Sequence, residues 1–243
     1  MTEPVRLGVG LVVLIAIACA VLRQAEVRLE RAVVAASLRA AVQLALVAAA
    51  LRGVFAAPIA VIGVLAVMFT VATWTAARRL GDPRGALKPV ALACGAGATV
   101  TIGVIVGLPT LTRDVRTLVA VSGIVLGATM TAATLTGRHL REGLRRRREE
   151  VEAWLSLGAT PRQAVRPIAR TAAFEAMLPA LDQTRTVGLV TLPGAFIGAL
   201  LGGASATAAA RFQVVVLVGL LCAEAITATL LAHQLGAPAT LPE

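Results

Sequence analysis

The chain has 243 residues, of which 58% are hydrophobic and 15% charged, and its mean hydropathy is +0.84. A soluble domain carries roughly 45–50% apolar and about 25% charged residues, so this composition excludes an ordinary soluble protein and indicates a chain embedded in lipid. The net charge of +10 does not indicate nucleic-acid binding, because the arginines flank apolar runs and no basic face carries interleaved aromatic residues.

Seven apolar segments predict an all-α, polytopic membrane protein with about seven transmembrane helices. The segments cover residues 7–22, 33–51, 54–77, 90–108, 118–135, 187–201 and 214–232. A helix needs about 20 residues to cross the hydrocarbon core, and it must satisfy its own backbone groups because no water is present there. We therefore expect one transmembrane domain over residues 1–243, with a cytoplasmic loop at residues 137–186 between the fifth and sixth helices.

Lysine and arginine are concentrated in alternate connections between these segments. The connections at residues 23–32 and 78–89 are basic, and the connection at residues 136–186 holds ten arginines. Because cytoplasmic connections carry the excess of positive charge, we expect a multi-pass protein of the inner or plasma membrane, with its N-terminus outside and its C-terminus in the cytoplasm. Ala18-Cys19-Ala20 leaves open that the first segment is a cleaved signal peptide.

Polar residues inside two of the segments are candidates for a transport pathway, because a charge inside the membrane is costly. Arg39 and Gln43 lie four residues apart, hence on one face of the second helix. Arg39 either extends to the cytoplasmic interface or faces inward, whereas Gln43 is too short to reach that interface. Glu224, in the seventh segment, either pairs with a cation such as Arg39 or offers its carboxylate to a passing cation.

The later segments contain a helix break and many glycines. Pro193-Gly194 interrupts the sixth segment, and the freed carbonyls either line a pathway or belong to an architectural kink. Glycines spaced four residues apart either allow close packing within the chain or form the seam of a homodimer. They are Gly103 and Gly107, Gly123 and Gly127, and Gly194, Gly198 and Gly202.

The long basic loop predicts a helix, a turn and a second helix. Val151 and Ala164 are two of the apolar positions in residues 149–173, which also carry acidic and basic side chains. Gly158 ends the first helix, and Thr160-Pro161 has the form of a cap followed by proline at the first helical position. Such an element suits insertion into a groove on a partner; the alternative is an amphipathic helix that rests on anionic lipid.

Nothing in the chain indicates catalysis. The only histidines, His139 and His233, are far apart, and no phosphate-cradling loop of the form G-x-x-x-x-G-K-[ST] is present. We therefore expect a protein that is not an enzyme and binds no cofactor. If ATP drives it, ATP and Mg²⁺ bind to another polypeptide.

Several motifs resemble those of transporter permeases. Glu152-Ala153-Trp154, followed by Gly158 and Ile168, resembles the loop signature of ATP-binding-cassette (ABC) importer permeases. A broader resemblance, from about Arg39 to Ala232, is to the FetB-type permease family, the membrane subunits of bacterial iron exporters related to plant aluminium-tolerance permeases. It is carried by the segments 39–44, 122–127, 155–164 and 186–194.

This resemblance implies a homodimeric permease domain that exports iron or another metal ion and is driven by a separate cytoplasmic ABC ATPase. The implied coupling residues are Glu152, Ala153, Leu157, Gly158, Ala159, Pro161, Pro179 and Asp182. The candidate pathway residues are Arg39, Gln43, Thr129, Pro193, Gly194 and Glu224. The alternative function is an ATPase-independent channel or carrier for a small solute.

Overall fold

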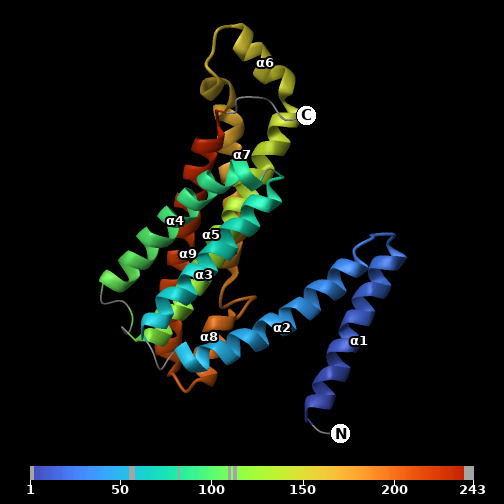
Figure 1. Ribbon diagram of the computed structural model, residues 1–243, viewed down its shortest axis with the longest axis vertical. Helices are drawn as coiled ribbons and strands as arrows, with labels where there is room; N and C mark the ends of the chain where they lie inside the picture. Colours follow the sequence, from blue (N-terminus) through green and yellow to red (C-terminus); the bar gives the residue numbers. More distant parts are fainter. Residues whose placement is uncertain (1–2, 55–57, 82, 109–110, 112–113, 238–243) are drawn as a thin grey trace. The chain divides into compact units, whose positions relative to one another are not determined.

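The computed structural model describes residues 3–54, 58–81, 83–108, 111 and 114–237 (Figure 1). The chain divides into two compact units, Met1–Pro58 and Ile59–Glu243. Nine helices make up nearly all of the described part, so the predicted all-α, polytopic class is confirmed.

The first unit is a helical hairpin. Helix α1 (Glu3–Gln24) packs against α2 (Glu30–Val54), and Glu26, with a φ of 57°, lies in the turn between them. None of the described side chains of this hairpin is buried. Two apolar helices whose surfaces are open on almost every side are typical of segments solvated by lipid.

The second unit contains the other helices. They are α3 (Pro58–Arg79), α4 (Pro83–Gly107), α5 (Val115–Arg146), α6 (Arg148–Ser156), α7 (Pro161–Thr186), α8 (Gly194–Leu201) and α9 (Ala206–Leu235). Helix α9 is central, because it packs against α4, α5, α7 and α8. Figure 1 shows α6 at one end of this unit and α8 at the other.

Small residues let α4 and α9 approach closely. A Cβ atom on Gly97 would collide with the side chain of Thr227 and the carbonyl of Ala223. At the same crossing, Thr227 Oγ1 donates a hydrogen bond of 3.3 Å to the carbonyl of Ala93. Since lipid tails are as apolar as leucine, helices in a membrane associate through this kind of close packing and interhelical bonding.

Helix α5 is too long to end at the membrane surface. Asp114 caps its start by accepting a bond of 3.2 Å from the backbone N–H of Thr117. Its 32 residues span about 48 Å at about 1.5 Å per residue, compared with about 30 Å for a hydrocarbon core. Its last turns, which carry Arg145 and Arg146, therefore extend into water.

Six helices in the described part are long and apolar enough to cross a membrane, namely α1 to α5 and α9. The apolar segment at residues 187–201, in which Pro193-Gly194 was expected to interrupt the helix, is not one of these six helices. The backbone leaves the helical conformation at Val187 and re-enters it only at Gly194, so α8 has just eight residues.

Helix α7 packs along α5 and α9. Its start lies beside the last turns of α9, and its second half lies beside the middle of α9 and α5. The chain then continues through residues 187–193 to α8, which packs on α9. The assignment of residues 137–186 to a cytoplasmic loop stays a prediction.

Candidate functional site

A groove of about 280 Å³ opens between α5, α7 and α9. Its lining comprises Ile124, Gly127, Ala128, Thr131 and Leu135 of α5, Ala176, Pro179, Ala180 and Gln183 of α7, and Leu220 and Glu224 of α9. Most of these residues are apolar or small. The polar groups that converge in the groove are a carboxylate, a carboxamide and a hydroxyl.

Glu224 is the charged residue of this groove. It is 8% exposed, and its carboxylate has no hydrogen bond or ion pair among the described residues. Counted along α9, it lies about 27 Å from Ala206 and about 17 Å from Leu235, so it is near the middle of a helix long and apolar enough to cross a membrane. An unpaired carboxylate at that depth is costly, and such residues typically mark ion or substrate pathways.

Two neighbours add further oxygen ligands to the groove. Gln183 projects from the last turns of α7 and its side chain is exposed. Thr131 on α5 donates its hydroxyl hydrogen to the carbonyl of Gly127, 3.0 Å away, which leaves its oxygen lone pairs available. Pro179 has no N–H to donate to the carbonyl of Glu175, so that turn of α7 lacks one helical hydrogen bond.

The helix break lies one turn beyond Gln183. Gly188 has a φ of +81°, a conformation that glycine adopts without strain. Its N–H donates to the carbonyl of Thr191 at 2.9 Å, and the N–H of Val190 donates to the carbonyl of Thr186 at 3.0 Å. These local bonds satisfy part of the backbone, which is a condition for irregular structure at membrane depth.

At the other end of α7, α6 is fixed rigidly to the bundle. Val151 on α6 is 1% exposed and packs in one apolar cluster with residues of α5, α7 and α9. The cluster is Leu140, Leu144, Val151, Ala164, Val165, Ile168, Ala169, Ala172 and Ala232. A further tie between α5 and α7 is the contact of His139 Nδ1 with Glu175 Oε2, at 3.0 Å.

The predicted helix–turn–helix is confirmed. Gly158 has a φ of +88° in the turn after α6. Thr160 caps α7 reciprocally with Gln163: the N–H of Thr160 donates to Gln163 Oε1 at 2.8 Å, and the N–H of Gln163 donates to Thr160 Oγ1 at 3.4 Å. Pro161 occupies the first turn of α7, as expected.

The outer side of this arm, which we define as residues 147–160, combines an apolar tip with charged flanks. Leu157 is 81% exposed and Trp154 is 49% exposed. Arg148 pairs with Glu152 at 2.8 Å, and two hydrogen bonds from the Arg147 guanidinium lower the pKa of Glu150. Exposed large apolar residues on a water-facing arm are typical of a surface that docks on a protein.

The other predicted coupling residues fall in two places. Ala153, Gly158 and Pro161 are exposed on or beside the arm. Asp182 is far along α7, where its carboxylate lies 3.5 Å from Arg185 Nη1. Pro179 lines the groove with Glu224 and is not part of the arm.

The predicted pathway residues are not all brought together. Arg39 and Gln43 are exposed on α2, in the first unit, so the pairing of Arg39 with Glu224 stays a prediction. Thr129 is fully buried, and its hydroxyl donates to the carbonyl of Leu126 at 3.0 Å, so it does not line the groove. Pro193 caps α8 and Gly194 begins it.

Three residues of the site were missed from sequence. Gln183 and Thr131 join Glu224 only because α7 folds between α5 and α9. Trp154 was part of the quoted motif, but its position close to a glycine turn, on a segment dense in charge, was the signal that its side chain is exposed.

Comparisons with known proteins agree with the motifs. A family model described as "Uncharacterised protein family (UPF0014)" matches residues 6–238. "UPF0014 membrane protein STAR2" of Oryza sativa subsp. japonica is 37% identical over 83% of this chain and 72% of its own length. "UPF0014 membrane protein YjkA" of Bacillus subtilis (strain 168) is 31% identical over 83% of this chain and 82% of its own.

A third relative carries a functional description. "Probable iron export permease protein FetB" of Escherichia coli (strain K12) is 28% identical over 84% of this chain and 79% of its own length. This match confirms the predicted resemblance to FetB-type proteins. No solved structure matches the chain.

Proposed function

Because the chain belongs to the UPF0014 membrane protein family, we propose that it is the permease subunit of an ATP-driven exporter of iron or another metal ion. The direction and the cargo come from the description of the Escherichia coli relative as an iron export permease. ATP and Mg²⁺ bind to a separate cytoplasmic ABC ATPase, and this chain supplies the pathway.

The observation that carries the proposal is the continuous connection between the arm and the groove. The arm is anchored to α7 through Val151, and α7 then runs as one helix to Gln183 in the groove and ends at the helix break. A push on the exposed tip is therefore transmitted to the groove as a rigid-body movement. Discontinuous helices beside a mid-membrane site are the elements that move in many transporters.

The groove suits the transit of a cation. One carboxylate with amide and hydroxyl oxygens is a donor set for hard or borderline metal ions. No group of three or more histidine, cysteine or acidic residues that could hold a metal is found in the described part of the chain. In a single chain, Glu224 would therefore bind a cargo ion only weakly and release it easily during transport.

A second copy of the chain completes the pathway. Leu189 and Val190 in the helix break are 89% and 79% exposed, and irregular backbone at membrane depth must be buried in protein or line a water-filled cavity. A Cβ on Gly103, Gly107, Gly127, Gly194 or Gly198 would meet no atom within 4 Å. Packing within the second unit therefore does not explain these glycines, and we infer that they belong to the seam of a homodimer that places two Glu224 side chains on one pathway.

Gly158 gives the test of this function. Its left-handed φ costs other residues roughly 1–2 kcal/mol, but asparagine tolerates it better. With the ATPase co-reconstituted in liposomes, Gly158→Arg should insert normally yet abolish metal-stimulated ATP hydrolysis, whereas Gly158→Asn should retain most of it. Unchanged stimulation in Gly158→Arg would exclude the lever, and metal flux without any ATPase would favour a channel or carrier.

A further inference from the structure

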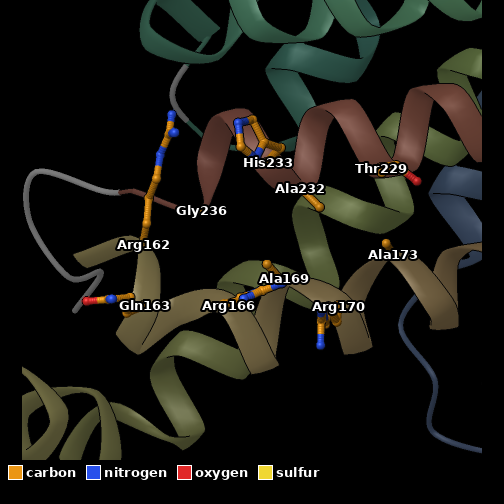
Figure 2. A pocket seen from close by; sticks show the side chains of 10 residues that line it. All are labelled: Arg162, Gln163, Arg166, Ala169, Arg170, Ala173, Thr229, Ala232, His233 and Gly236. Atoms are coloured by element: carbon orange, nitrogen blue, oxygen red, sulfur yellow. The ribbon is translucent and has the colours of Figure 1, made fainter. Parts of the chain in front are cut away.

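A second groove, of about 440 Å³, lies between the first half of α7 and the last turns of α9 (Figure 2). Its lining comprises Arg162, Gln163, Arg166, Ala169, Arg170, Ala173, Thr229, Ala232, His233 and Gly236. It is distinct from the groove of Glu224, with which it shares no lining residue. The exporter mechanism proposed above makes no use of it.

The permanently charged side chains that line this groove in the described part of the chain are all arginines. Arg162, Arg166 and Arg170 are spaced four residues apart, so they form one stripe along α7. Among the residues that the structure describes, the lining contains no acidic side chain, and none of the three arginines has an ion pair or side-chain hydrogen bond. In Figure 2, Arg162 extends from the first turn of α7, and His233 projects from the facing end of α9.

The groove has two different sides. The arginine stripe runs from Arg162 to Arg170, whereas small, largely apolar residues line the inner side, with Ala169 and Ala173 on α7 and Ala232 and Thr229 on α9. A basic rim beside a small, largely apolar floor matches the two parts of a phospholipid. A small soluble anion needs only the basic rim.

We propose that this groove binds the phosphate headgroup of an anionic phospholipid from the cytoplasmic leaflet, with an acyl chain along its alanine floor. Basic pockets between transmembrane helices on the cytoplasmic side are a known type of site for such headgroups. The N-terminus of α7 adds the positive end of a helix dipole at the same place. The bound lipid would hold the first half of α7, the moving helix, against α9.

Native mass spectrometry of the purified full-length chain tests this, with phosphatidylglycerol or phosphatidylcholine added in detergent. We expect phosphatidylglycerol to be retained in preference to phosphatidylcholine. Each arginine near a membrane surface contributes about fivefold to the binding of an anionic lipid. The variant with Arg162→Gln, Arg166→Gln and Arg170→Gln should therefore lose roughly 100-fold in apparent affinity.

The matched control removes the same charge from another basic connection. Arg78, Arg79 and Arg84 are also exposed and lie outside the groove, so replacing all three with glutamine should leave retention within about twofold. The three groove arginines changed to lysine should keep most of the binding. Equal losses in the groove and control variants would overturn the proposal, because a general surface potential would then explain the effect.

Two further measurements identify the source of the anion. Millimolar inorganic phosphate should not displace phosphatidylglycerol, and displacement would show a site for a soluble phosphate. If the groove variant kept its lipid but no longer bound the ATPase, the stripe would be a protein-docking surface. Either result would overturn the lipid assignment without affecting the proposed export function, which is tested at Gly158.

Discussion

Glu224 of α9 and Gln183 of α7 line the same groove, and neither side chain has a hydrogen-bond or ion-pair partner in the described part of the chain. The first belongs to a helix in the middle of the bundle, and the second to a helix whose other end carries the arm. In the proposed function, this relationship makes α7 the link between the ATPase and the carboxylate of Glu224. It also indicates which substitutions should impair transport without unfolding the protein.

Replacing Glu224 should abolish transport without harming the fold. A buried, unpartnered carboxylate costs free energy, so Glu224→Gln should unfold at the same temperature as the parent protein or a higher one. ATP-driven metal export into proteoliposomes should fall at least about tenfold, because the groove loses its charge. Glu142→Gln, which removes an exposed carboxylate paired with Arg146, is the control and should export normally.

The tip of the arm should decide whether the ATPase binds. Leu157→Asp places a charge on an 81% exposed leucine, and it should weaken association with the ATPase by about tenfold or more if that leucine is a central contact of the interface. Co-purification of the two subunits measures this. Glu149→Ala, an exposed change elsewhere on the arm, should leave the complex intact, and loss of binding in both variants would point to a damaged arm.

The crossing of α4 and α9 should tolerate no added volume at Gly97. Gly97→Val should destabilise the protein by roughly 1–3 kcal/mol, because the new side chain meets Thr227 and the backbone of Ala223. At Gly63, on α3, the same substitution meets open space. Thermal unfolding in detergent compares the two, and an equal loss of stability in both would contradict the packing described.

The helix break should depend on the backbone of Gly188. Gly188→Ala should cost roughly 1 kcal/mol because of the φ of +81°, and it should slow transport more than it lowers stability. Gly10→Ala is the control, since Gly10 is helical and open, and it should be neutral or slightly stabilising. A neutral result at Gly188 would mean that the break does not need its present geometry.

The apolar helices and the arm could be predicted from the sequence. Uninterrupted apolar runs predicted α1 to α5 and α9, and Gly158, Thr160 and Pro161 predicted the turn between α6 and α7. These signals are local. The length of an apolar run, a capping residue and a glycine turn each depend on residues that are close together in the sequence. Glu224 was found for the same reason, as a charge within an apolar run.

The course of α7 could not be predicted in this way. Its first half carries three arginines, and its second half carries Glu175, Asp182 and Arg185, so its hydropathy is too low to indicate a helix within the bundle. Its position follows from tertiary packing against α5 and α9. Gln183 and Thr131 could therefore not be assigned to the site of Glu224, and Thr129 was assigned to it although its side chain faces the core.

The side of the membrane on which the arm lies tests the account most directly. Leu157→Cys, in a background in which Cys19, Cys94 and Cys222 are replaced, should react with a membrane-impermeant maleimide only when the cytoplasmic face is accessible, as in inside-out vesicles. The ATPase should block that labelling when it is added. Labelling of intact cells from outside would place the arm beyond the reach of any cytoplasmic ATPase and contradict the proposed function.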